Sequence, residues 1–157
     1  MRWCSKMSSA RYYIAYGSNL NLEQMKMRCP TAEVVGASEL KGYKLVFKGA
    51  LTNAYATIEE CTDGAVPVLI WSLKPQDEKA LDRYEGYPRF YFKEMHTIVV
   101  NNEPIEAMVY IMNKECKEGI PSGNYYNTIM KGYKDNGLST EYLEQALKEC
   151  VKNVNGN

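Results

Sequence analysis

Residues 11–30 read RYYIAYGSNLNLEQMKMRCP and predict a strand, a turn and a helix in direct succession. The first five residues are rich in aromatic and β-branched side chains, which favour a strand. The tripeptide Gly17-Ser18-Asn19 follows and is typical of a turn. Residues 21–28 have a helical pattern, with Asn19 or Asn21 available as the N-cap and a proline two residues past the end. The pattern therefore places a tight turn between the end of a strand and the start of a helix.

The middle of the chain predicts several short strands and one helix. A helix is expected from Pro75 to Tyr84, because proline suits the first turn and Gly86 and Pro88 follow the last one. The turn-like residues 101–103 join two of the strands. The expected strands cover residues 33–38, 43–47, 54–59, 67–73, 90–100 and 104–112.

The remaining chain has a helical pattern in two parts. Residues 125–133 form one expected helix, which Asn136-Gly137 interrupts. Ser139 is the expected cap of a final helix through residues 141–147. Strands before and between a few helices, without regular βαβ alternation, predict an α+β fold with a curved sheet, and periodicity leaves open whether that sheet closes. We expect one domain over residues 11–150, a flexible segment at 1–10 and a flexible tail at 151–157.

Composition excludes several classes of function. Lys and Arg together number 19, as do Asp and Glu, so no net charge draws the protein to nucleic acid or to an anionic membrane. No apolar run is long enough for a signal peptide or a membrane span, so we expect a cytoplasmic protein. The five cysteines are scattered and there is one histidine, His96, which argues against a disulfide framework and against a zinc site.

Three segments occur in an order that resembles the γ-glutamylcyclotransferase and AIG2-like family. The order and spacing make this combination specific, although each segment alone is a weaker signal. The resemblance extends from about Tyr13 to Leu147. The three segments are Tyr16-Gly17-Ser18-Asn19-Leu20, Leu81-Asp82-Arg83-Tyr84-Glu85-Gly86-Tyr87-Pro88 and Pro121-Ser122-Gly123-Asn124-Tyr125, and weaker matches are Ala56-Thr57-Ile58, Gly132 and Asn136-Gly137-Leu138.

This resemblance implies a small mixed, mostly antiparallel β-barrel flanked by helices, and an enzyme that needs no cofactor. The implied reaction converts a γ-glutamyl amino acid or amine into 5-oxoproline and the free amine. Glu85 matches the family's catalytic glutamate, and Tyr125 matches the tyrosine of its Pro-Ser-x-x-Tyr motif. The implied substrate-binding loop consists of Tyr16, Gly17, Ser18, Asn19 and Leu20.

The residue types suit this chemistry. A carboxyl group at a helix end has its pKa raised by the helix dipole and by burial, which lets Glu85 exchange protons near neutral pH. A strand-to-helix turn presents backbone N–H groups to an anionic group, and Gly17 permits close approach. The alternatives are an exposed glutamate beside a C-cap glycine and a turn whose Ser18 or Asn19 only caps the helix. Ser122 is expected to cap a helix rather than to act as a nucleophile.

The substrate is less defined than the fold. After Tyr-Gly-Ser, the glutathione-specific branch has a different continuation from the Asn19-Leu20-Asn21 found here. We therefore rank that branch lower as a match to this chain. Residues 86–91 after the glutamate look more like bacterial AIG2-like members. Two alternatives stay open: an enzyme that removes a γ-glutamyl group from a larger biosynthetic amine, and a catalytically silent module that binds a small metabolite or a partner. Neither the released amine nor the oligomeric state follows from the sequence.

Overall fold

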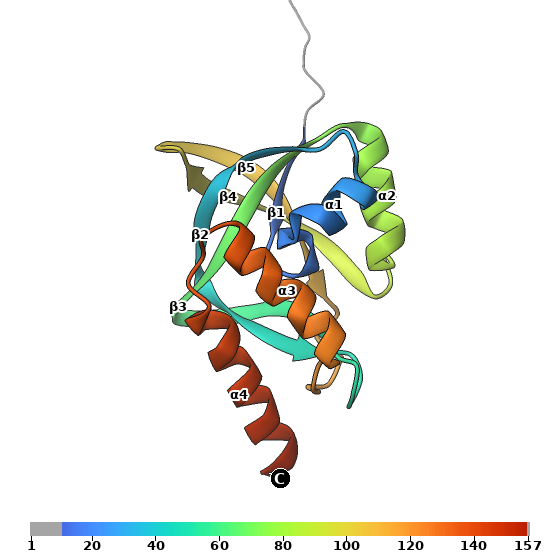
Figure 1. Cartoon of the computed structure of the whole chain (residues 1–157), viewed down its shortest axis with the longest axis vertical. Helices are drawn as coiled ribbons and strands as arrows, with labels where there is room; N and C mark the ends of the chain where they lie inside the picture. Colours follow the sequence, from blue (N-terminus) through green and yellow to red (C-terminus); the bar gives the residue numbers. More distant parts are fainter. Residues whose placement is uncertain (1–10, 157) are drawn as a thin grey trace, which may run out of the picture.

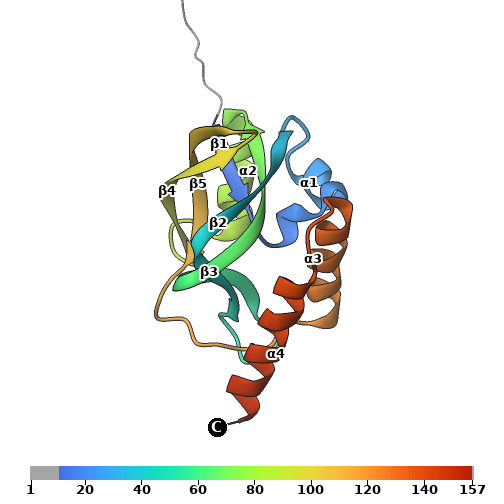
Figure 2. The ribbon, with the colours of Figure 1, turned by 90° about the vertical axis from the view of Figure 1, so that its left-hand side faces the viewer.

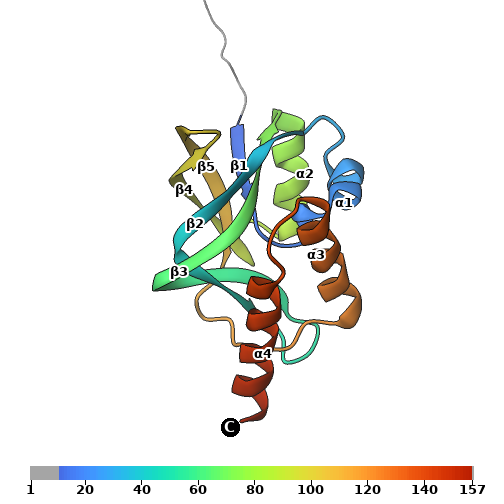
Figure 3. The same cartoon turned by 60° about the vertical axis from the view of Figure 1, so that its left-hand side comes forward.

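A curved five-stranded sheet forms the centre of the protein, which this computed structural model describes over residues 11–156 (Figure 1). The strand order is β2-β3-β1-β5-β4, and every neighbouring pair is antiparallel except β1 and β5. Figure 3 shows α1, α2 and α3 on one side of the sheet, with α4 extending away from it. The elements are β1 (Arg11–Ala15), the 3-10 helix η1 (Ser18–Leu20), α1 (Leu22–Arg28), β2 (Glu33–Lys48), β3 (Tyr55–Leu73), α2 (Pro75–Glu85), β4 (Tyr91–Val100), β5 (Glu103–Met112), α3 (Gly123–Asp135) and α4 (Glu141–Asn155).

The prediction of four short strands between residues 33 and 73 is wrong, because the chain forms two long ones. β2 and β3 pair along almost their whole length, and both strands are strongly bent (Figure 2). Gly36 and Gly42 lie at register shifts of this ladder, and residues 61–64 of β3 fall between paired positions. A bulge bends a strand without ending it, and glycine is favoured at bulges as well as at turns. The glycines therefore mark bends here.

The closed barrel implied by the resemblance is not confirmed. Side chains connect the edge strand β2 to β4 and to the turn after β4: Ser38 Oγ donates to the Val99 carbonyl at 2.5 Å, and Asn101 Nδ2, in the turn, donates to the Val35 carbonyl at 3.1 Å. Within residues 11–156, no backbone ladder joins these two strands. The sheet is strongly curved but open.

Helix boundaries follow local chemistry in most places. The Asn21 side chain caps α1 by accepting from Gln24 N at 3.0 Å, and Pro75 begins α2. Ser122 caps α3, as expected, by accepting from Tyr125 N at 3.2 Å. No helix in the described part of the chain is long and apolar enough to cross a membrane.

The carboxyl-terminal helix differs from the prediction at both ends. Its N-cap is Thr140 rather than Ser139, and Thr140 makes no side-chain capping bond. α4 continues to Asn155, so residues 151–155, expected in a flexible tail, are helical. The reason is the continued apolar stripe, because Leu147, Cys150 and Val151 all pack against the core. The expected flexible segment at residues 1–10 lies outside the described residues.

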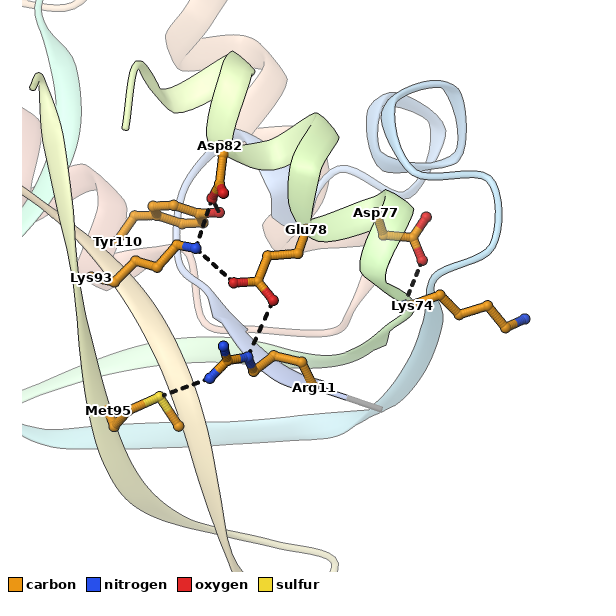
Figure 4. A network of polar contacts seen from close by, with 8 residues as sticks. All are labelled: Arg11, Lys74, Asp77, Glu78, Asp82, Lys93, Met95 and Tyr110. Atoms are coloured by element: carbon orange, nitrogen blue, oxygen red, sulfur yellow. Dashed lines mark hydrogen bonds and ion pairs between the residues drawn. The ribbon is translucent and has the colours of Figure 1, made fainter. Parts of the chain in front are cut away.

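A network of charges and hydrogen bonds fixes α2 to the sheet (Figure 4). Lys93 Nζ on β4 lies 2.6 Å from Glu78 Oε2 and 2.9 Å from Asp82 Oδ1. The Tyr110 hydroxyl on β5 donates to Asp82 Oδ1 at 2.6 Å, and Arg11 Nε on β1 donates to Glu78 Oε1 at 3.2 Å. Because three strands hold the same helix, its carboxyl end has a defined position over the sheet.

Candidate active site

A cavity of about 370 Å³ opens where β1 and α2 end and where β3 and α3 begin. Six of the seven site residues expected from the sequence line it, namely Tyr16, Gly17, Ser18, Asn19, Glu85 and Tyr125. The seventh, Leu20, does not line the cavity; its side chain is fully buried in the core. Segments from 40 to 109 residues apart in the chain (125 − 85 and 125 − 16) therefore meet in one place, and Leu20 supports the loop from within.

Glu85 is the last residue of α2 and is partly buried at the cavity. Gly86 ends the helix in the left-handed conformation, with φ of 67°, as the sequence predicts. Burial raises the pKa of the Glu85 carboxyl from 4.5 to about 7, and the positive charge of Arg28 opposes this rise. Near neutral pH, the carboxyl group is therefore able both to accept and to donate a proton.

The turn at residues 17–19 leaves backbone donors at the cavity. The first two backbone hydrogen bonds of η1 run from Leu20 N to the Gly17 carbonyl and from Asn21 N to the Ser18 carbonyl, each at 3.0 Å. The N–H groups of Ser18 and Asn19 precede these bonds and have no partner inside the turn. Such donors suit a carboxylate or a developing oxyanion.

Gly17 is needed for the close packing of this turn against the opposite wall. A Cβ atom at this position would lie 3.3 Å from Ala56 Cβ and 3.7 Å from the Tyr125 hydroxyl oxygen. Any larger side chain would fill space between the turn and Tyr125. The glycine thus keeps the cavity open next to Ser18 and Asn19.

Tyr125 contributes a hydroxyl group that donates no hydrogen bond to the described residues. Its oxygen accepts a hydrogen bond from Ala56 N at 3.0 Å, which leaves the O–H free to donate. Burial raises the pKa of Tyr125 well above its usual value, so the hydroxyl stays protonated at neutral pH. Tyr126, the next residue, does not line the cavity. The Tyr125 hydroxyl is therefore able to donate a hydrogen bond at the cavity.

Tyr91 and Tyr110, which were not expected from the sequence, also line the walls. Tyr16 donates to the Tyr110 carbonyl at 2.6 Å, and Tyr91 donates to the Ala56 carbonyl at 2.7 Å. Burial raises the pKa of Tyr16 and of Tyr91, so both rings stay neutral. With 13 tyrosines in the chain, no local signal distinguishes Tyr91 or Tyr110 from core residues. Their place at the cavity depends on strand pairing.

Arg28 and Tyr84 form a second unexpected feature. The Arg28 guanidinium donates to Asn19 Oδ1 and, at 3.0 Å, to Gln24 Oε1. It also lies over the Tyr84 ring, 3.6 Å from the centroid. The Tyr84 hydroxyl is in turn hydrogen bonded to Ser18 Oγ at 3.0 Å. These contacts connect the loop with the residue that precedes Glu85.

Helix α3 supports the loop from the core side. A Cβ atom at Gly132 would lie 2.6 Å from Leu20 Cβ and 2.7 Å from Asn21 N, so only glycine permits this packing. Asn136 Nδ2 donates to the Leu20 carbonyl at 2.8 Å. These contacts give a structural reason for the sequence matches at residues 132 and 136.

Comparisons with known proteins agree with this arrangement. The family described as gamma-glutamyl cyclotransferase, AIG2-like, matches residues 13–127. Gamma-glutamylcyclotransferases of Bos taurus and Homo sapiens are each 30% identical to this chain, over 85% of it and 75% of their own length. A solved structure of a gamma-glutamyl cyclotransferase superposes with a TM-score of 0.78 at 25% identity, covering 94% of this chain and 99% of the other. The chain therefore belongs to the gamma-glutamyl cyclotransferase, AIG2-like family.

Proposed function

We propose that the protein is a γ-glutamylcyclotransferase that converts a γ-glutamyl amino acid or amine into 5-oxoproline and the free amine. One observation carries the proposal: a carboxyl group with a pKa of about 7, Glu85, faces the same cavity as the turn at residues 17–19. Membership of the family and the human and bovine relatives support it.

The reaction rearranges bonds within one substrate molecule. The α-amino nitrogen attacks the γ-carbonyl carbon and forms the new C–N bond of the lactam, while the C–N bond to the leaving amine breaks. We propose that Glu85 takes one proton from the α-ammonium group and returns it to the leaving nitrogen. The attacking nitrogen loses a second proton as the lactam N–H forms, and that proton protonates the released amine. One carboxyl group is then regenerated in each turnover, and general acid–base help of this kind contributes about 10²- to 10⁴-fold.

The loop and Tyr125 serve binding and charge stabilisation in this proposal. The N–H groups of Ser18 and Asn19 hold the substrate carboxylate or the carbonyl oxygen, and the Tyr125 hydroxyl donates a further hydrogen bond. Holding both ends of a short flexible chain raises the population of the ring-closing conformer. The substrate carries its own nucleophile, so neither a covalent intermediate nor a cofactor is needed. We also propose a cytoplasmic location, because such small metabolites are met there.

The proposal is tested with a panel of γ-glutamyl-alanine, γ-glutamyl-ε-lysine and glutathione, with 5-oxoproline measured by mass spectrometry. Wild type is expected to release it from at least one compound, and Glu85→Gln from none. Glu141→Gln is the matched control, because it removes an exposed carboxylate at the start of α4. Equal turnover by wild type and a folded Glu85→Gln would overturn the assigned role. If wild type releases no 5-oxoproline from any compound, the proposed activity fails.

The loop is tested separately with Gly17→Val. Its branched side chain would enter the space next to Ala56 and Tyr125, where even a Cβ atom has tight contacts. We expect a folded protein that no longer binds the γ-glutamyl compounds in isothermal titration calorimetry. Unchanged affinity in this variant would show that the loop does not hold the substrate.

A further inference from the structure

The carboxyl end of α1 places one cation between the two halves of the proposed site. Arg28 reaches the substrate loop through Asn19 Oδ1, and it covers the Tyr84 ring at 3.6 Å. The Tyr84 hydroxyl is in turn hydrogen bonded to Ser18 Oγ on the substrate loop. Asn19, Arg28, Tyr84 and Ser18 thus form a ring of contacts that joins the loop to the residue next to Glu85.

The chemistry of this ring requires a guanidinium group. A planar guanidinium group donates along its edges and stacks with its face at the same time. Arg28 uses both properties, because separate nitrogens donate to Asn19 and Gln24 while the plane lies on Tyr84. A lysine ammonium is a point charge without a flat face, so it preserves the charge and loses this double contact.

We propose that Arg28 is a positioning residue for the cyclisation: it holds the substrate loop and the Glu85 end of α2 at a fixed separation and supplies positive charge to that end of the cavity. This inference rests on the proposed function. Arg28 does not need to touch the substrate, because it acts through Asn19, Ser18 and Tyr84. A small displacement of a catalytic group relative to its substrate costs about a hundredfold in rate, so such a clamp has a measurable effect.

Apart from Arg28, few charged groups lie near Glu85 to supply positive charge there. Arg28 acts on the Glu85 carboxylate from α1, and its charge lowers the pKa of Glu85 against the effect of burial. Among the described residues that line the cavity, Arg83 on α2 carries a positive charge, whereas Arg28 lies outside the lining. The other titratable groups among the described lining residues are tyrosines from β1 and the following residue, β3, α2, β4, β5 and α3: Tyr13, Tyr16, Tyr55, Tyr84, Tyr91, Tyr110 and Tyr125.

Two substitutions separate the geometric role from the electrostatic one. Arg28→Lys keeps the charge and breaks the clamp, so kcat/KM is expected to fall tenfold or more, on the order of the loss for a misplaced group, while the pH profile stays in place. Arg28→Gln removes the charge as well. The carboxylate form of Glu85 is then less favoured, its pKa rises, and the acid limb of the kcat/KM profile is expected to move to higher pH by roughly one unit. A merely structural role would leave that limb unmoved.

Lys26→Gln is the matched control, because it removes one positive charge from the exposed face of the same helix. It is expected to keep the wild-type rate and profile, and circular dichroism checks that each variant is folded. A folded Arg28→Gln with the wild-type kcat/KM and acid limb would overturn the inference. If Arg28→Gln does not fold, a folded Arg28→Lys with full kcat/KM overturns it instead. Release of 5-oxoproline by wild type decides the proposed function separately.

Discussion

Replacing Glu85 by glutamine is expected to stabilise the protein at alkaline pH while removing its activity. In the folded protein the pKa of Glu85 is about 7, whereas an exposed carboxyl group has a value near 4.5. Below pH 4.5 both folded and unfolded chains carry the proton. Between pH 4.5 and 7 the unfolded chain loses it first, so native stability falls as pH rises. Above pH 7 the full penalty of the buried carboxylate is present.

The magnitude follows from the raised pKa. Each pKa unit corresponds to about 1.4 kcal/mol, so the rise to about 7 corresponds to about 3 kcal/mol at pH 8. The carboxyl group is partly open to the cavity, where water reduces this figure to about 2 kcal/mol. Glutamine has a similar shape and no charge, so Glu85→Gln avoids this cost.

The assay is urea unfolding of wild type and Glu85→Gln at pH 4 and pH 8. Other titrating groups are common to both proteins and cancel in the comparison. The variant is expected to match wild type within about 0.5 kcal/mol at pH 4 and to exceed it by about 2 kcal/mol at pH 8. If the difference between the two proteins is the same at both pH values, Glu85 does not have a raised pKa, and this reasoning is refuted.

Three further substitutions test the surroundings of the site. Gly132→Ala would place a Cβ atom 2.6 Å from Leu20 Cβ, so thermal unfolding is expected to show a loss of about 1–3 kcal/mol despite the better helix former; unchanged stability would contradict the packing. Tyr125→Phe removes a donor from the cavity and the acceptor of a backbone N–H, so kcat/KM is expected to fall about 100-fold in steady-state assays, and a fall of less than threefold would exclude the donor role. Tyr55 is 46% exposed at the cavity and packs edge-on against Phe90, with the ring centroids 6.0 Å apart. Tyr55→Ala is therefore expected to raise KM severalfold for substrates with apolar leaving groups and to leave KM for γ-glutamyl-ε-lysine unchanged. An equal rise in KM for both kinds of substrate would contradict this reasoning.

Local signals in the sequence predicted those parts of the site that depend on neighbours in the chain. The turn at residues 17–19 lies between a strand and a helix, and Gly86 ends the helix that carries Glu85, as expected. In both cases the residues involved, glycine and asparagine, strongly prefer turns and helix ends. The local sequence is therefore enough to predict the conformation.

Parts that depend on distant contacts were not predicted. Gly36 and Gly42 resemble turn residues, and only pairing with β3 shows that the strand continues through them. Tyr110 reaches the cavity because β5 runs parallel to β1, a relation that periodicity does not contain. Arg28 has the appearance of a basic residue at a helix end, where it suits the dipole, and its contacts with Asn19 and Tyr84 appear only in three dimensions.

The most direct test of the central claim is the product formed from γ-glutamyl-alanine in water enriched in ¹⁸O, measured by mass spectrometry. Cyclisation breaks the γ-amide bond without water, so the account predicts 5-oxoproline free of ¹⁸O and one alanine for each molecule formed. The Glu85→Gln protein is predicted to leave the substrate intact. Glutamate carrying ¹⁸O in its γ-carboxyl group would show hydrolysis and would contradict the account.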